Sequence, residues 1–141
     1  MSMPETIHAT CVAWGDRAVL VSGSSGSGKS ALGLQLLAYG CQLVADDRVR
    51  VTAHEGALMA HCPETISGII EARGMGIMKA RPLEQSTVVL MVDLDQSETE
   101  RMPPKRRFTL LGCDLPLIYR VDAPQFAPGI LQVLKLGWSE R

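Results

Sequence analysis

The sequence predicts an α/β domain with a mixed β-sheet, and three features of the chain support this class. A short apolar run of strand character, Arg17–Ser22, leads into a glycine-rich segment and then into the helix-forming run Ala31–Tyr39. The nearly all apolar, β-branched run Thr87–Asp93 is typical of a central strand that is buried on both faces. Alternating apolar and polar segments joined by short turns predict additional hairpins.

The N-terminal part is expected to form two strands before the glycine-rich segment. Ile7–Trp14 predicts the first strand, and Gly15-Asp16 predicts a turn into the second strand. The helix that follows the glycine-rich segment is expected to end at Tyr39, because Gly40 stands where a C′ glycine belongs. A strand, a glycine-rich loop and a helix therefore follow one another.

The middle of the chain predicts short strands. Cys41–Ala45 is mostly apolar, and Val49–Ala53 alternates before Glu55-Gly56 turns into Ala57–Ala60. We expect these last two strands to form a hairpin. Ser67–Glu71 predicts another short strand.

The C-terminal part, residues 94–141, is less regular. Residues 94–107 are rich in charge and contain Pro103-Pro104, which predicts a solvated, mobile connection. Leu115–Val121 predicts a strand, and Pro124–Pro128 is expected to end it. Gly129–Leu136 predicts a short closing helix. With 141 residues, the chain is expected to form one domain over 1–141.

The glycine-rich segment reads G-x-x-x-x-G-K-S, a pattern that predicts a phosphate-binding loop, or P-loop. Glycines allow backbone N–H groups to converge on phosphate oxygens, and the lysine and serine can hold the outer phosphates and a bound Mg²⁺. A turn that binds nothing is disfavoured, because the strand and helix lie where the motif requires them. The predicted nucleotide-binding residues are Gly23, Ser24, Ser25, Gly26, Ser27, Gly28, Lys29 and Ser30.

An acidic pair follows the strand after the loop helix. A carboxylate beside a phosphate loop can hold Mg²⁺ or accept the proton of an attacking hydroxyl, so Asp46 and Asp47 are candidate site residues. Because side chains alternate along a strand, one carboxylate is expected to face the phosphates while the other supports it. The alternative is a pair of turn-forming aspartates, which the nearby phosphate loop makes less favourable.

Two further residues are weaker candidates. Glu71 lies at a predicted strand end before Gly74 and Gly76, where it can complete a metal site or form a surface ion pair. His8 lies on an apolar strand, and such a histidine is more often structural than catalytic.

Composition excludes several other classes. A net charge of −1 does not favour nucleic acid or an anionic membrane as a partner, and two Phe, two Tyr and two Trp leave few surfaces on which bases can stack. No apolar run approaches the length of a membrane span, and no leader-like segment opens the chain, so the protein is expected to be cytoplasmic.

The four cysteines are scattered and are expected to be reduced and mostly buried. A metal site built from Cys62, His61 and His54 is an alternative that lacks the usual ligand spacing.

Four motifs in this order resemble the catalytic domain of bacterial HPr kinase/phosphorylase. They are His8 on the first strand, the loop Gly23–Ser30, Leu43–Asp47 (L-V-A-D-D) and Glu71–Ile77 (E-A-R-G-M-G-I). The resemblance extends over about residues 6 to 93 and is weak beyond them. It implies a fold similar to the nucleotide-binding core of phosphoenolpyruvate carboxykinase.

The resemblance also implies an activity, a partner and residue roles. The protein would be an ATP- and Mg²⁺-dependent kinase of a serine on HPr or a related carrier of the phosphotransferase system, assembled as a hexamer. Lys29 would contact phosphates, Ser30 and Glu71 would bind the metal, and Asp47 would accept the proton. His8 would be an active-site residue and Asp46 a neighbour of the metal. The stretch Glu71–Lys79 matches a region tied to both reaction directions.

The chain also departs from the family pattern. It starts almost at the catalytic domain, as expected of a short form that lacks the N-terminal domain, and it has Ala31 where Ser30 is commonly followed by Glu. The family's C-terminal loop carries an arginine, whereas Val121–Ile130 has none. This absence argues against the phosphorolytic reverse activity. Arg120 or the cluster Arg101–Arg107 can substitute, although a solvated charge run is the simpler interpretation.

Two other functions stay open from the sequence. One is a small-molecule kinase with the cluster Arg101–Arg107 as a lid, and the other is a nucleotide-sensing regulatory protein without phosphoryl transfer. A GTPase is disfavoured because the sequence has no N-K-x-D motif.

Overall fold

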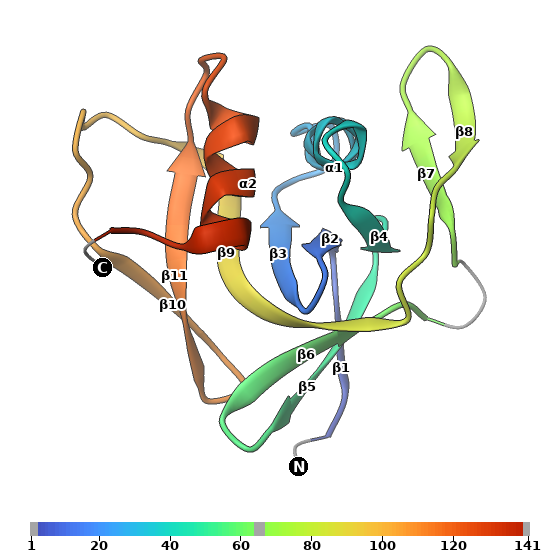
Figure 1. Cartoon of the computed structure of the whole chain (residues 1–141), viewed down its shortest axis with the longest axis horizontal. Coiled ribbons are helices and arrows are strands. Elements are labelled where there is room, and N and C mark those ends of the chain that lie inside the picture. The colour runs from blue at the N-terminus through green and yellow to red at the C-terminus, as the bar shows by residue number, and fades with distance from the viewer. Residues whose placement is uncertain (1–2, 64–66, 140–141) are drawn as a thin grey trace.

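A strongly bent mixed β-sheet forms the centre of the structure, a computed structural model that describes residues 3–63 and 67–139 (Figure 1). Two helices, α1 (Lys29–Ala38) and α2 (Phe126–Leu136), lie side by side near one face of the sheet. The strands are β1 (Glu5–Ile7), β2 (Ala9–Trp14), β3 (Arg17–Ser22), β4 (Gln42–Ala45), β5 (Val49–His54), β6 (Ala57–His61), β7 (Ile69–Ala72), β8 (Gly76–Lys79), β9 (Gln85–Ser97), β10 (Arg106–Leu110) and β11 (Cys113–Arg120).

The long strand β9 organises the sheet. Among the described residues, this sheet has nine strands. Seven follow the order β1-β5-β6-β9-β3-β2-β4, and the other two, β10 and β11, join it where β11 pairs with β9. The start of β9 pairs antiparallel with β6, whereas its later part runs parallel to β3 and to β11. The carboxyl ends of β3, β9 and β11 therefore lie at one edge, where ligands of α/β sheets commonly bind. The predicted α/β class with a mixed sheet is confirmed.

Alternating side chains of the central strands build the core on both faces of the sheet. Val19 and Val21 of β3 belong to the cluster on the helix side, together with Leu36 of α1 and Leu134 of α2. Each of these four side chains is fully buried. Burying a side chain of this size contributes about 1.5–3 kcal/mol, so this cluster fixes the two helices against the sheet.

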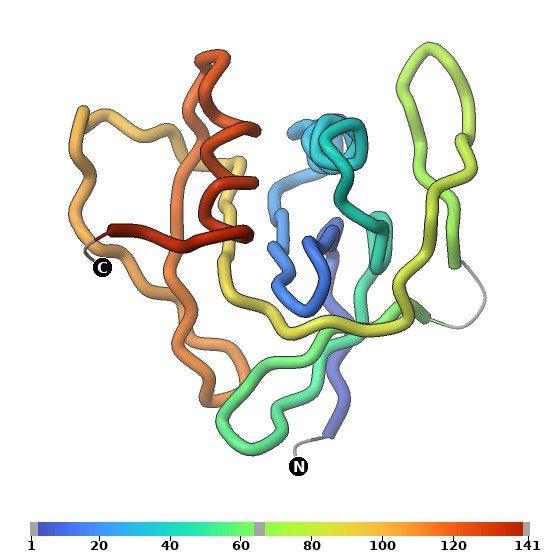
Figure 2. Tube along the Cα trace, in the orientation of Figure 1, coloured from blue at the N-terminus to red at the C-terminus, as the bar shows by residue number. Residues whose placement is uncertain are grey.

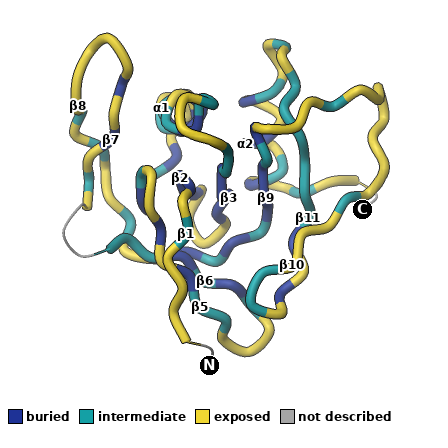
Figure 3. The backbone as a smooth tube through the Cα atoms, turned by 180° about the vertical axis from the view of Figure 1, so that it is seen from behind, coloured by how far each residue is buried: buried dark blue, intermediate teal, exposed yellow. Residues whose placement is uncertain are grey.

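The opposite face is covered by the bent sheet itself. Leu20 of β3 belongs to a second buried cluster with Val51 of β5, Leu58 of β6 and Leu115 of β11. Figure 3 shows the buried inner strands from behind, with the exposed residues concentrated in the outer segments. Burial on both faces explains why the central strands are apolar almost without interruption.

The β7–β8 hairpin stands beside α1, apart from the main sheet (Figure 2). Ile70 of β7 is 1 % exposed and joins the helix-side cluster. Gly33 permits this close packing, because a Cβ there would lie 2.9 Å from Thr10 Cγ2 and 3.5 Å from Ile70 Cδ1. The opposite end of the hairpin exposes Met75 and Ile77.

Several N-terminal predictions are confirmed and one is wrong. Arg17–Ser22, the β5–β6 hairpin and the loop helix form as expected, and Gly40 takes the C′ role with a φ of 106°. The single strand predicted at Ile7–Trp14 is instead two strands that are interrupted at His8. The chain changes partner there, because β1 pairs with β5 whereas β2 lies between β3 and β4.

The C-terminal part is more regular than predicted. The central strand extends to Ser97, and Arg106–Leu110 forms β10, so the predicted connection 94–107 is wrong at both ends. Glu98 anchors the remaining segment by accepting hydrogen bonds from Thr99 N and Glu100 N. The closing helix starts at Phe126, before its predicted start, because Pro128 falls in the first turn, where no backbone N–H is required.

The described cysteines are free, and Cys11, Cys41 and Cys113 are buried. Burial raises the pKa of Cys11, and it raises that of Cys41 to about 11. The prediction of reduced, mostly buried thiols is thus confirmed. Neither described helix is long and apolar enough to cross a membrane.

Candidate functional site

The loop Gly23–Ser30 connects β3 to the N-terminus of α1 and has a backbone that requires glycine. Gly23 has a φ of 156°, and a Cβ there would lie 2.4 Å from Ser27 Oγ. Gly28 is the N-cap of α1 with a φ of 105°, and space is open above it, since a Cβ there would meet nothing within 4 Å. The helix has no acidic residue in its first turn, so its partial positive charge is directed at the loop without local compensation.

Lys29 contributes a buried positive charge to the loop. The residue is 6 % exposed, and its Nζ donates hydrogen bonds to the carbonyl oxygens of Gly23 at 3.1 Å and Ser24 at 3.3 Å. A buried ammonium is costly unless its donors are satisfied, and the loop backbone supplies these acceptors. Together with the N-terminus of α1, Lys29 makes the loop suited to an anion.

Asp46 connects three elements around the loop. Its Oδ1 accepts hydrogen bonds from Ser30 Oγ at 2.6 Å and from Thr10 Oγ1 at 2.9 Å. Its Oδ2 accepts a hydrogen bond from the backbone N–H of Glu71 at 3.1 Å. Sequence reasoning missed Thr10; its signal is a polar residue, here fully buried, within an otherwise apolar strand.

Asp47 pairs with His8. Its Oδ1 lies 2.6 Å from His8 Nε2, and the two side chains are 65 % and 49 % exposed, respectively. Asp47 follows the end of β4 and has a φ of 68°, so the strand alternation expected for Asp46 and Asp47 does not apply. The interruption of the first strand places His8 at the position from which it reaches this carboxylate.

One cavity of about 700 Å³ brings most of the predicted residues together. Lys29, Ser30, Asp46, Asp47 and Glu71 line it, with Ser25, Gly26, Gly28 and Arg73 among the other lining residues. His8 is adjacent through its bond to Asp47. Gly23, Ser24 and Ser27 are not among the lining residues; Gly23 and Ser24 support Lys29 through their carbonyl groups. Carboxylates and a buried ammonium thus share one cavity.

The oxygen donors at this cavity fit Mg²⁺ bound together with a phosphate. Ser30 Oγ and Asp46 Oδ1 are 2.6 Å apart, and Mg²⁺ in such sites uses one or two protein oxygens together with phosphates and waters.

Within residues 3–63 and 67–139, no group of three or more His, Cys, Asp or Glu side chains is arranged to hold a metal ion. The alternative site at Cys62, His61 and His54 is therefore wrong, and His61 instead bonds Thr52 Oγ1 at 3.2 Å.

Asp95, at the end of β9, was missed by sequence reasoning. Its carboxylate accepts hydrogen bonds from Ser24 N at 3.0 and 2.9 Å and from Ser24 Oγ at 2.8 Å. These bonds lower the pKa of Asp95, and the charges of Lys29 and Arg120 lower it further. The signal in the sequence was an acidic residue shortly after an apolar run that predicts a strand. That strand, β9, runs parallel to β3, which brings Asp95 to the carboxyl edge of the sheet.

Arg120, at the end of β11, also contacts the loop. Its Nε donates a hydrogen bond to Leu94 O at 3.1 Å, and its Nη2 donates one to Ser27 O. The sequence offers Arg120 and the cluster Arg101–Arg107 as substitutes for the arginine that the segment Val121–Ile130 lacks. Of these two, Arg120 lies at the loop.

The cluster Arg101–Arg107 lies elsewhere. Arg106 pairs with Glu98 at 3.2 Å and stacks 4.3 Å from the centre of the Tyr119 ring. No residue of this cluster is among those that line the 700 Å³ cavity. Because Arg106 and Arg107 belong to β10 and the cluster does not line the cavity, the structure does not favour the small-molecule kinase with this cluster as a lid.

Comparisons with known proteins point to one family. Residues 1–114 match the family model of the HPr Serine kinase C-terminal domain. The HPr kinase/phosphorylase of Clostridium novyi is 33 % identical over 129 residues, covering 86 % of this chain and 40 % of that protein. The HPr kinase/phosphorylase of Xanthomonas campestris pv. campestris is 35 % identical over 129 residues, covering 80 % and 41 %.

A solved structure is similar over almost the whole chain. It is the Hpr(Ser) kinase/phosphatase from Coxiella burnetii, with a TM-score of 0.76, 26 % identity, and coverage of 93 % of this chain and 94 % of that chain. The chain spans about two fifths of the length of the curated relatives it matches. The matched residues 1–114 include the glycine-rich loop, both aspartates and the β7–β8 hairpin. The chain therefore belongs to the HPr serine kinase C-terminal domain family.

Proposed function

We propose that this chain is an ATP- and Mg²⁺-dependent protein kinase that phosphorylates a serine on an HPr-like phosphocarrier. The observation that carries the proposal is the shared cavity, in which Lys29 and Ser30 of the loop lie together with Asp46 and Asp47. The names of the relatives, HPr kinase/phosphorylase and Hpr(Ser) kinase/phosphatase, support the same reaction and partner.

The loop would hold the phosphates of ATP. Its backbone N–H groups and the positive N-terminus of α1 favour the anion, and Lys29 adds a full charge next to it. An anion would offer the Lys29 ammonium new acceptors in place of the carbonyl oxygens of Gly23 and Ser24. The open space above Gly28 supports close approach of a phosphate to the backbone.

The residues Ser30, Asp46 and Glu71 would hold Mg²⁺ with the outer phosphates. Ser30 and Asp46 already share a hydrogen bond, and Glu71 lines the same cavity. When bound, the ion neutralises part of the charge on the transferred group. Thr10 would act as a positioning residue for Asp46, because its hydroxyl donates to the same carboxylate oxygen as Ser30.

Asp47 would accept the proton of the incoming serine. The serine oxygen forms a bond to the terminal phosphorus, the bond to the bridging oxygen of ADP breaks, and the serine proton passes to the Asp47 carboxylate. His8 would position this carboxylate by donating from Nε2 to Oδ1. The exposure of both side chains suits a reaction with a protein substrate, which must approach from solvent.

The phosphorolytic direction lies outside this proposal, because the segment 121–130 carries no arginine. A core similar to phosphoenolpyruvate carboxykinase, a cytoplasmic location and a hexameric assembly stay predictions.

A transfer assay tests the proposed function. The purified chain is incubated with an HPr-like carrier, MgCl₂ and ATP labelled at the γ-phosphate, and the modified residue of the carrier is mapped. We expect label on one serine, and no label when that serine is replaced by alanine. Nucleotide binding without transfer would contradict the kinase and favour the regulatory alternative. Transfer to a metabolite but not to the carrier would favour the small-molecule kinase.

A further inference from the structure

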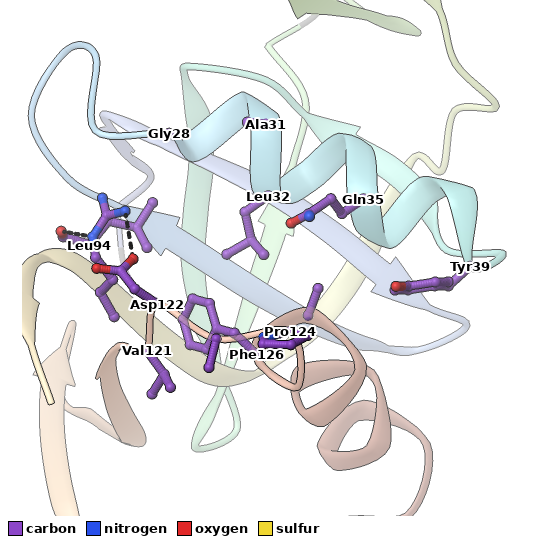
Figure 4. Close-up of a pocket in the computed structure, with 13 residues that line it drawn as sticks. Gly28, Ala31, Leu32, Gln35, Tyr39, Leu94, Val121, Asp122, Pro124 and Phe126 are labelled. Atoms are coloured by element: carbon purple, nitrogen blue, oxygen red, sulfur yellow. Dashed lines mark hydrogen bonds and ion pairs between the residues drawn. The ribbon is translucent and has the colours of Figure 1, made fainter. Parts of the chain in front are cut away.

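A second cavity, of about 290 Å³, lies on the other side of the start of α1 (Figure 4). It begins at Gly28 of the loop and extends along the helix to Tyr39. Its opposite wall is the segment between β11 and α2, which includes Asp122 and Pro124, together with Phe126, the first residue of α2. Its volume is close to the lower end of the range for small-molecule sites, about 300 Å³.

The two cavities meet at the loop. Gly28, Ala31 and Gln35 line both of them, so α1 separates them along its first two turns. The carboxylates of Asp46 and Asp47 line only the larger cavity. A polyphosphate whose reactive end faces these carboxylates can extend past Gly28 towards the smaller cavity.

The sheet topology also favours the smaller cavity as a ligand site. The smaller cavity lies beyond the carboxyl ends of β9 and β11, since Leu94 and Arg120 line it. β9 runs parallel to β3, the strand that leads into the loop, and β11 runs parallel to β9. In α/β sheets, ligands bind outside the carboxyl ends of adjacent parallel strands.

The lining of the smaller cavity combines an apolar surface with a few polar groups. Phe126 and Pro124 lie across the cavity from Leu32 of α1 (Figure 4). Gln35 offers an amide, and Asp122 offers a carboxylate that is 80 % exposed. Aromatic rings stack on nucleic-acid bases, and carboxylates accept hydrogen bonds from ribose hydroxyls.

We propose that the smaller cavity binds the nucleoside portion of the nucleotide, an inference that rests on the proposed function of the loop. Phe126 supplies the surface on which the base packs, and Asp122 accepts hydrogen bonds from the ribose. Arg120, which pairs with Asp122 at 3.7 Å and contacts the Ser27 carbonyl, lies between the nucleoside and the phosphates.

Comparison of two ligands tests this subsite. Titration calorimetry measures the affinity of the full chain for Mg²⁺ with a non-transferable ATP analogue and for Mg²⁺ with inorganic tripolyphosphate, which lacks a nucleoside. We expect Phe126→Ala to weaken binding of the ATP analogue about tenfold, because base stacking is lost, and to leave tripolyphosphate affinity within twofold. Phe108→Ala is the matched control, since Phe108 is 37 % exposed on β10 and does not line the cavity.

Asp122→Ala keeps the test independent of folding, because the Asp122 side chain is largely exposed whereas Phe126 packs on the core. We expect it to weaken binding of the ATP analogue several-fold and to leave the affinity for tripolyphosphate unchanged. Wild-type affinity of both variants for the ATP analogue would overturn the subsite, and so would an equal loss of affinity for both ligands.

The same protein samples separate this subsite from the proposed function. If the wild type phosphorylates the carrier while both variants bind the ATP analogue normally, the subsite alone is wrong. If the variants lose affinity only for the nucleoside-bearing ligand while the wild type phosphorylates no serine, the subsite stands and the kinase proposal is wrong.

Discussion

The carboxylate of Asp47 lies 2.6 Å from Nε2 of His8, although 39 positions separate the two residues in the chain. The contact exists because the first strand is interrupted at His8 and because Asp47 adopts a φ of 68° after β4. A left-handed conformation is unfavourable for a residue other than glycine and often marks a functional position. This pair gives the proposed proton acceptor a fixed orientation at the edge of the cavity.

Replacing His8 is expected to slow transfer without preventing nucleotide binding. In His8→Ala, Asp47 loses the group that orients it, and we expect kcat to fall about tenfold with little change in the KM for ATP. Steady-state kinetics with the carrier measure both values. His54→Ala is the control, since His54 lies at the end of β5 and does not line the cavity. An unchanged kcat in His8→Ala would remove the positioning role.

Replacing Lys29 is expected to abolish transfer. Lys29→Ala removes the buried charge beside the loop, and loss of such a group commonly costs at least 100-fold in rate. Circular dichroism is expected to report an intact fold, because the lost hydrogen bonds join Lys29 only to nearby loop carbonyls. Lys105→Ala, at an exposed position, is the control. Near-wild-type transfer in Lys29→Ala would contradict the role assigned to this residue.

Two glycines within helices are expected to respond in opposite ways to alanine. Gly129→Ala in α2 has no atom within 4 Å of the new Cβ, so the higher helix propensity should stabilise the chain by about 0.5–1 kcal/mol. Gly33→Ala in α1 places Cβ 2.9 Å from Thr10 Cγ2, and overpacking of this kind costs about 1–3 kcal/mol. Urea unfolding of both variants measures the difference. Equal stabilisation by the two changes would show that α1 does not pack tightly on Thr10.

Asp95 is expected to make the free energy of unfolding depend on pH in the acidic range. Because its pKa is lowered in the folded state, its contribution is fully present above the pKa of the unfolded chain and is lost as the pH falls through the folded-state pKa. Asp95→Asn lacks this titration, so its stability should decline less steeply than that of the wild type between about pH 5 and pH 2. Thermal unfolding across this range measures the slopes, and Glu84→Gln is an exposed control. Parallel curves for wild type and Asp95→Asn would contradict the Ser24–Asp95 anchor.

The local parts of the fold could be predicted from the sequence because each residue type acts on its own neighbourhood. Arg17–Ser22, the glycine-rich loop and α1 follow from an apolar run, glycines that permit positive φ, and helix-forming residues. Gly40 ends the helix as expected for the same reason. The loop and the two aspartates were therefore predictable as residues of the candidate site.

The parts that depend on distant partners could not be predicted. β10 exists because it pairs with β11, and the polar end of β9 stays extended partly because Ser97 pairs with Arg120. Thr10 and Asp95 reach the site only through bonds to residues 36 and 71 positions away. Neither residue lies within a motif that marks these contacts.

The proposed proton acceptor is tested most directly by phosphoryl transfer in Asp47→Asn, compared with its nucleotide binding. Asparagine keeps the size of the side chain and removes the proton-accepting charge, so we expect wild-type affinity for the ATP analogue and a fall of at least 100-fold in carrier phosphorylation. Single-turnover transfer and calorimetry on the same sample give both values. Transfer at the wild-type rate, with binding intact, would contradict the claim that Asp47 accepts the serine proton.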